Sequence, residues 1–325
     1  MANKSGRDDA KRTKRNSKCN TNRNGGGGRE ASSEKPLLPL KLDVVFKRVF
    51  GDRNAPEILA DFLSAALDMP VEDFDNLEIS DPALLPEYVG DKLSILDVRI
   101  FMKDGKAIDV EIQQQDVDAM EERCVYMNAR MLAGQLQIGQ NYGILKRAIS
   151  IIITNFRMVR EDEMYHHRFV MHDPRAGVTF TDIMQVDLLE LPKLPSERDE
   201  SRLWNWLRVI DKVEDKGMEQ EIERIMEENP MIGKAVMKLR EMSADEVERE
   251  IAFRRMIAIA DEQGRLEYAR KEGLDEGRKE GEAKGIKKGE AKARREDAAR
   301  MKATGIDIAL IEKITGLSAE EIASL

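Results

Sequence analysis

The sequence predicts an α/β fold with a mixed central sheet, followed by an α-helical C-terminal extension. Two observations carry this prediction. Residues 94–113 alternate between apolar and polar side chains on both sides of a turn, which is typical of two strands with one buried face. Residues 148–155 form a nearly continuous β-branched run, which is typical of a central strand buried on both faces.

The segment before the alternating residues is predicted to form two helices and a short strand. Apolar residues recur at helical spacing over 42–50 and again over 54–68. Asn54 is a possible cap for the second helix, and Pro56 suits its first turn, where no amide hydrogen is required. A short strand is expected over 77–79.

The segment after the alternating residues is predicted to hold a long helix, three strands and further helices. The helix covers 116–140, and the central strand follows it. Two more strands are expected over 166–171 and 182–188, and residues 197–260 have helical patterns. This order of elements is compatible with a mixed central sheet.

The composition limits the classes of protein to be considered. At 325 residues the chain can hold one sizeable domain with extensions, or two small domains. The net charge of −9 argues against general polyanion binding, so contact with nucleic acid would need local basic patches. Cys19 and Cys124 are too few for a disulfide framework, which favours a reducing cytoplasm. The chain has no apolar run long enough for a membrane span and no apolar stretch of a secretory signal near its start.

The two ends of the chain have unusual compositions. Residues 1–35 are basic and Gly-rich and have almost no apolar residue, so we expect a disordered tail. We favour a solvated segment over a phosphate-binding arm. Over 263–300 glycine recurs every four residues, from Gly273 to Gly289. Each interior glycine weakens a helix by about 0.8–1 kcal/mol relative to alanine. We favour an exposed helical linker over a close contact between two protomers.

Residues 301–325 are predicted to form a hairpin of two short amphipathic helices. Ser318 and Glu321 have the spacing of a capping box at the start of the second helix. The arrangement is similar to a helix-turn-helix, but the second helix has no Arg, Lys, Asn or Gln with which to read bases. A packing or homo-oligomerisation hairpin is therefore favoured over DNA reading.

The turn at the centre of the alternating segment decides whether its acidic residues can form a site. A two-residue turn at Asp104-Gly105 would place Asp97 and Glu111 on opposite faces. A three-residue loop from Lys103 to Gly105 pairs Asp97 with Glu111 and makes the apolar sets coincide, so we expect this register. Carboxylates this close repel each other unless they share a divalent cation, and hard oxygen ligands suit Mg²⁺ or Mn²⁺.

These residues support a resemblance to a known family. Asp97, followed by Glu111-x-Gln113, resembles the signature of the PD-(D/E)XK nuclease superfamily, with Gln113 in place of the usual Lys. Over about residues 36–320 the chain resembles the Rpn-type recombination-promoting nuclease/putative transposase family. The flanking motifs that narrow the resemblance are Asp43-Val-Val-Phe46-Lys47-Arg-Val-Phe50, Ile95-Leu-Asp97-Val-Arg, Val110-Glu-Ile-Gln113, Arg123-x-x-Tyr126, Gln135-Leu and Gly139-x-x-Tyr142.

The resemblance implies a restriction-endonuclease-like core over 36–195, followed by a helical extension over 196–262. It also implies a Mg²⁺- or Mn²⁺-dependent DNA endonuclease with Asp97 and Glu111 as metal ligands. Gln113 can orient water through its amide but carries no positive charge.

The positive charge that Gln113 lacks needs another source. Lys47 is our candidate for supplying it, with Arg99 and Arg130 as alternatives. Arg99 is the less attractive of these two, because the expected register places it opposite Asp109 as a cross-strand ion pair.

Simpler interpretations stand beside each of these assignments. Half-exposed hairpins carry outward-facing acidic residues in many proteins, and Asp43 and Lys47 have the spacing of a surface pair on a helix. Arg123 and Tyr126 lie on the helix after Gln113 and could face a phosphate. The three histidines have no paired spacing to carboxylates and are interpreted as structural or surface groups: His166, His167 and His172. The alternative function is a catalytically inactive interaction or oligomerisation module that retains the fold.

Overall fold

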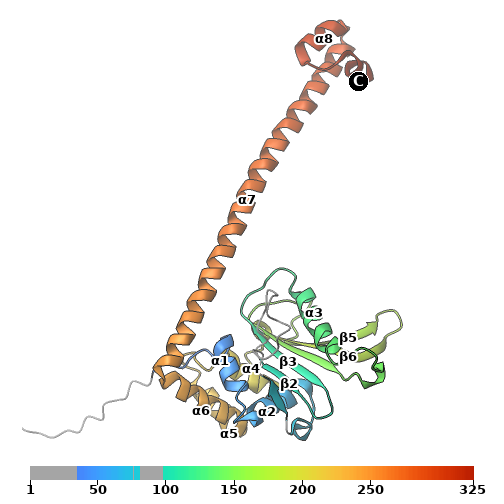
Figure 1. The fold of residues 1–325 in the computed structure, drawn as a ribbon. Coiled ribbons are helices and arrows are strands. Elements are labelled where there is room, and N and C mark those ends of the chain that lie inside the picture. The colour runs from blue at the N-terminus through green and yellow to red at the C-terminus, as the bar shows by residue number, and fades with distance from the viewer. Residues whose placement is uncertain (1–34, 76, 81–97) are drawn as a thin grey trace, which may run out of the picture. The chain divides into compact units, whose positions relative to one another are not determined.

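The computed structural model describes residues 35–75, 77–80 and 98–325. They contain a six-stranded mixed sheet in the order β1-β2-β3-β4-β6-β5 (Figure 1). The strands are β1 (Glu78–Ser80), β2 (Val98–Phe101), β3 (Ala107–Gln113), β4 (Ala148–Thr154), β5 (His166–Asp173) and β6 (Val178–Glu190). The predicted α/β fold with a mixed sheet is confirmed: β3, β4 and β6 are parallel, and the outer pairs are antiparallel.

The hairpin of β2 and β3 has the predicted three-residue loop. Met102 N donates to Lys106 O at 2.9 Å, and Gly105 has a φ of +88°, which favours glycine. Arg99 lies opposite Asp109, as expected. Both faces of this hairpin are buried, whereas the alternation predicted one buried face, because a helix covers the polar side. Asp97 lies outside the described residues.

One face of the sheet packs against α1 (Asp43–Phe50), α2 (Pro56–Leu67) and α4 (Arg202–Lys212). An aromatic cluster of Phe46, Phe50, Phe62 and Trp206 joins the three helices, with ring centroids 4.3–6.0 Å apart. Such packing explains why the helices after the sheet share a core with those before it. The cap expected from Asn54 is wrong, because the residue before α2 is Ala55 and makes no side-chain cap.

The opposite face is covered by α3 (Met120–Ala133), which lies between β3 and β4 in sequence (Figure 1). Asn128 Nδ2 anchors this helix by donating to Ala148 O, Ser150 Oγ and Gln185 O at 2.9–3.1 Å. The helix is shorter than the predicted 116–140. It ends because the Gln135 amide pairs with the backbone of Lys146 in both directions, which draws the chain toward β4.

The remaining helices confirm the helical pattern expected after residue 197. They are α5 (Glu219–Glu228), α6 (Pro230–Ala244), α7 (Glu246–Ala303), α8 (Ile308–Thr315) and α9 (Ala319–Ser324), with short 3-10 turns η1 (Val71–Phe74), η4 (Tyr142–Ile144) and η5 (Leu191–Lys193) elsewhere. Helix α7 is 58 residues long and continues through the glycine-rich segment without interruption. The predicted capping box of Ser318 and Glu321 is present at the start of α9.

Some predictions on organisation are not tested by these elements. The predicted tail over 1–35 lies outside the described residues except for Lys35. The other domain boundaries stay predictions. No helix in the described parts of the chain is long and apolar enough to cross a membrane.

Candidate active site

Glu111 is a buried acidic residue near the carboxyl end of the central strand β3. It is 5% exposed and lies opposite Ile152 of β4, on the face covered by α3. In open α/β sheets, ligands bind at the carboxyl ends of parallel strands, which is where Glu111 lies. A buried carboxylate in this position needs a positive partner.

Two side chains donate to the same oxygen of Glu111. Arg123 Nη2 on α3 lies 2.6 Å from Glu111 Oε1, and Gln113 Nε2 also donates to Oε1. Among the described residues, no hydrogen bond reaches Oε2. Burial raises the pKa of the Glu111 carboxyl, and the charge and hydrogen bonds of Arg123 and Gln113 offset part of that rise. The hydrogen bonds from the described residues therefore converge on one oxygen of Glu111.

The glutamines at the end of β3 tie the site to two helical segments. Gln114 Nε2 donates to Lys41 O just before α1, and Gln115 Nε2 donates to Ile259 O of α7 at 3.0 Å. Gln113 itself lies opposite Thr154 of β4. These bonds fix the backbone on the C-terminal side of Glu111.

Lys47 lies on α1 and is half-buried. It lines a hollow of about 720 Å³ together with Val98, which is the first described residue after Asp97. Arg48, Arg53 and Lys238 line the same hollow, where Arg48 pairs with Glu248 and Lys238 pairs with Asp52. No ion pair joins Lys47 to Glu111 among the described residues, and the two belong to opposite faces of the sheet.

Asp43, one turn before Lys47 on α1, has a different partner from the one considered in the sequence. Its carboxylate accepts two hydrogen bonds from Arg255 Nε, at 2.7 and 2.9 Å. The interpretation of Asp43 and Lys47 as a surface pair is therefore wrong.

Arg123 is the residue whose role sequence reasoning missed. The motif suggested that it faces a phosphate, whereas the structure places it on Glu111. The signal was available, because Arg123 lies in the first turn of the helix that follows Glu111-x-Gln113. Its motif partner Tyr126 is 55% exposed, and Arg130 stacks over that ring at 5.7 Å. Cys124, beside Arg123, is buried, which raises the pKa of its thiol to about 12.

Two of the three histidines have carboxylate partners in space, which is compatible with their interpretation as structural or surface groups. His167 Nε2 lies 3.0 Å from Asp162 Oδ2, and His166 Nε2 lies 2.9 Å from Asp187 Oδ1. The partners come from a loop and from strand β6, respectively, so their spacing in sequence could not reveal them.

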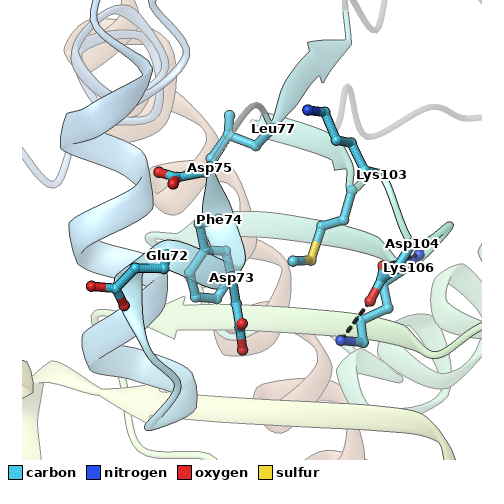
Figure 2. A pocket seen from close by; sticks show the side chains of 9 residues that line it. Glu72, Asp73, Phe74, Asp75, Leu77, Lys103, Asp104 and Lys106 are labelled. Atoms are coloured by element: carbon cyan, nitrogen blue, oxygen red, sulfur yellow. Dashed lines mark hydrogen bonds and ion pairs between the residues drawn. The ribbon is translucent and has the colours of Figure 1, made fainter.

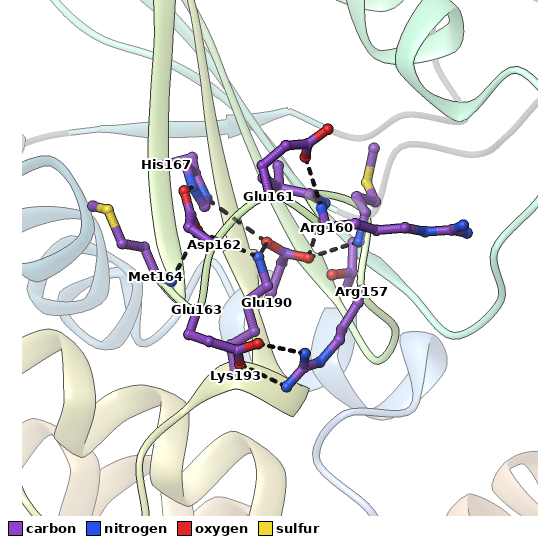
Figure 3. A network of polar contacts seen from close by, with 12 residues as sticks. Arg157, Arg160, Glu161, Asp162, Glu163, Met164, His167, Glu190 and Lys193 are labelled. Atoms are coloured by element: carbon purple, nitrogen blue, oxygen red, sulfur yellow. Dashed lines mark hydrogen bonds and ion pairs between the residues drawn. The ribbon is translucent and has the colours of Figure 1, made fainter.

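The His167 cluster is centred on the buried Glu190 (Figure 3). Glu190 Oε1 accepts from the amides of Met158 and Val159 at 2.6 and 3.3 Å, and Oε2 pairs with Lys193 Nζ at 2.7 Å. These contacts hold the loop after β4 against the sheet. The carboxylate is neutralised by Lys193, so the network has a structural role.

A second hollow, of about 360 Å³, lies at the turn end of the hairpin (Figure 2). Its lining includes Glu72, Asp73 and Asp75, and Asp104 pairs there with Lys106. From Lys106 to Glu111 the strand rises about 17 Å, taking about 3.4 Å per residue. The acidic lining would repel a polyanion, so this hollow is separate from the candidate site.

No three His, Cys, Asp or Glu side chains of the described residues gather into a group that could hold a metal ion. That search does not include Asp97, the predicted partner of Glu111. The contribution of this chain to a metal site is therefore visible only at Glu111.

The mixed sheet, with α3 crossing between β3 and β4 and a buried glutamate at the end of β3, defines an α/β fold of the PD-(D/E)XK type. The family model described as PD-(D/E)XK nuclease family transposase matches residues 40–269, and the chain belongs to this family. The resemblance found in the sequence is thereby confirmed. The searches of curated proteins and of solved structures gave no match.

Proposed function

We propose that this protein is a Mg²⁺- or Mn²⁺-dependent DNA endonuclease of the recombination-promoting nuclease/transposase type, which hydrolyses phosphodiester bonds in the cytoplasm. The observation that carries the proposal is the Glu111 carboxylate, which is buried at the end of β3 with both hydrogen bonds on Oε1. Glutamates are rarely buried without a functional or structural requirement.

The residues fit a hard divalent cation. Glu111 Oε2 is a carboxylate oxygen of the kind that Mg²⁺ and Mn²⁺ prefer, and it accepts no hydrogen bond among the described residues. We propose Asp97 as the second ligand, because continuing the register of β2 and β3 by one residue would bring it opposite Glu111. A bound cation would supply charge for the phosphate and a water of lowered pKa.

The other residues would act on water and on DNA. Gln113 donates to Glu111, which leaves its own carbonyl oxygen to orient a water molecule. Lys47 would supply positive charge for the DNA from the basic hollow beside Val98. The overall charge of −9 means that DNA binding must be local to such basic side chains.

Nicking of supercoiled plasmid tests the proposal. The wild-type protein should nick DNA with Mg²⁺ or Mn²⁺ and not with EDTA. Glu111→Gln and Asp97→Asn should abolish nicking and weaken Mn²⁺ binding measured by calorimetry without DNA. Asp104→Asn is the matched control, since it removes a carboxylate from the turn of the same hairpin. Retained nicking in Glu111→Gln would refute the proposal.

The alternative is a catalytically inactive module that interacts with DNA or with a second copy of the chain through its C-terminal helices. It is favoured by one observation, namely Gln113 in the position of the superfamily lysine. In that case the wild-type protein would neither nick plasmid nor bind Mn²⁺. Sedimentation equilibrium would instead show self-association that is lost on truncation before α8.

A further inference from the structure

The ion pair between Arg123 and Glu111 is made through a single hydrogen bond. Arg123 Nη2 donates to Glu111 Oε1, and Arg123 Nε is buried without a hydrogen-bond partner. Arg202 also donates to one oxygen of a buried carboxylate, Asp61, but there the other oxygen accepts from Trp206 and Asn229. Other pairs use two nitrogens. Arg157 donates to both oxygens of Glu163 at 2.7 and 2.8 Å, although that pair is far more exposed.

The lack of a hydrogen bond on Oε2 from the described residues is unexpected for a purely structural pair. A buried carboxylate gains most from a guanidinium when both oxygens are engaged in the forked geometry. Here Oε1 receives Arg123 and Gln113, whereas Oε2 receives neither. Arg123 therefore neutralises Glu111 and leaves open the oxygen that a divalent cation would take.

Arg123 and a cation on Glu111 would repel each other. Two positive charges a few ångströms apart in a poorly hydrated site interact strongly. The Arg123 side chain is 31% exposed, so its guanidinium can move outward into solvent. Helix α3 does not depend on this contact, because Asn128 anchors it to β4 and β6.

We propose that Arg123 exchanges partners. In the free protein it is the counter-ion of Glu111. When a divalent cation binds Glu111, Arg123 leaves the carboxylate and binds the phosphodiester that is to be cleaved. The inference rests on the proposed function and goes beyond it by assigning to Arg123 a second positive charge for the phosphate, beside the one proposed for Lys47.

The chemistry of arginine suits both partners. The guanidinium stays charged at all relevant pH values and matches carboxylate and phosphate geometry equally well. Metal and DNA binding would then be coupled, since the cation frees Arg123 for DNA. The same Arg123 must also lower the affinity of the DNA-free protein for metal.

The test measures Mn²⁺ affinity and plasmid nicking separately. Calorimetric titration of the full-length, DNA-free protein with Mn²⁺ should show about 5- to 150-fold tighter binding in Arg123→Ala, the usual range of coupling between two sites. Nicking by the same variant at saturating Mn²⁺ should fall by about 10²–10³-fold, as for loss of one electrostatic contact in a transition state. Arg198→Ala, which removes an arginine paired with Glu228 elsewhere, should change neither quantity.

Any other outcome contradicts either the exchange of partners or the proposed function. Unchanged or weaker Mn²⁺ binding in Arg123→Ala would refute the exchange, and so would tighter binding with undiminished nicking. If Arg123→Ala does not fold, Arg123→Gln carries the same test, because it removes the charge and keeps a donor. A wild-type protein that neither binds Mn²⁺ nor nicks DNA would refute the proposed function itself. Wild-type binding and nicking without the Arg123 effect would refute only the exchange.

Discussion

The backbone amide of Met102 donates a 2.9 Å hydrogen bond to the carbonyl of Lys106, and this bond fixes the pairing pattern of the whole β2–β3 hairpin. In antiparallel pairs, hydrogen-bonded and non-hydrogen-bonded positions alternate. Counting from Met102, Val98 and Val110 form a hydrogen-bonded pair. If this register continues by one residue, Asp97 and Glu111 would form a non-hydrogen-bonded pair, in which Cα atoms typically lie about 4.5 Å apart.

Cysteine cross-linking tests this register. In a background with Cys19 and Cys124 replaced by alanine, the double variant Asp97→Cys/Glu111→Cys should form an intramolecular disulfide under mild oxidation, because the expected Cα separation suits a disulfide. Asp97→Cys/Ile112→Cys should not, since Ile112 points to the opposite face. Mass spectrometry of non-reduced digests distinguishes the two. A disulfide only in the second variant would contradict the shared metal site.

Lys47 is predicted to supply positive charge for the phosphate at Glu111, which requires its side chain to reach past the end of the sheet from the opposite face. Lys47→Ala should lower the nicking rate by about 10²–10³-fold, and Lys47→Met should be equally impaired because it keeps the stem without the charge. Mn²⁺ affinity and folding should change little, since Lys47 is not a proposed ligand. Gln113→Lys should partly rescue either variant. Full activity of Lys47→Ala would rule out this role and turn attention to Arg130.

The carboxyl of Glu214, which lies outside the candidate site, is predicted to make the stability of the folded protein depend on pH. Burial raises the pKa of its carboxyl, although Lys41 lies 3.6 Å away. A folded-state pKa above the unfolded value means that the folded protein holds the Glu214 proton more tightly. The contribution of Glu214 to the free energy of unfolding therefore falls as pH rises through the two pKa values. Glu214→Gln should therefore raise the free energy of unfolding at pH 7.

The increase in the free energy of unfolding from Glu214→Gln should vanish below the unfolded-state pKa of about 4.5. There the Glu214 carboxyl is protonated in both the folded and the unfolded protein. Urea denaturation of the wild type and the variant, at pH 7 and at pH 4, measures these free energies of unfolding. Lys41 retains Asp211 at 3.1 Å in the variant, so no cation is left unpaired. Equal destabilisation at both pH values would contradict this prediction.

Replacing glycines of α7 distinguishes an exposed helical linker from a close contact between two protomers. Within the single chain, an added Cβ at Gly277 or Gly281 would meet no atom within 4 Å. Gly277→Ala/Gly281→Ala should therefore stabilise the helix by about 0.8–1 kcal/mol per site. Hydrogen exchange of this segment should slow, with no change in sedimentation. Weakened self-association instead would favour a close contact between protomers.

Local patterns in the sequence were sufficient for most of the fold. The β-branched run became β4, and the requirement that apolar faces coincide gave the hairpin loop that the Met102–Lys106 bond confirms. Such features depend on residues close in sequence, so periodicity and turn chemistry can predict them. The end of α3 could not be predicted, because it depends on Gln135 meeting Lys146 across a loop.

Motifs and local periodicity were enough to predict the family and the strand that carries Glu111, and to show that Gln113 replaces the usual lysine. The partner that neutralises Glu111 is visible only in the folded chain, because Arg123 lies on the helix that packs against this face of the sheet. The same holds for His166 and Asp187, which meet only when β5 and β6 pair. The charge partner of a buried group depends on which side chains lie near it in space. Separation along the sequence carries little information about that proximity.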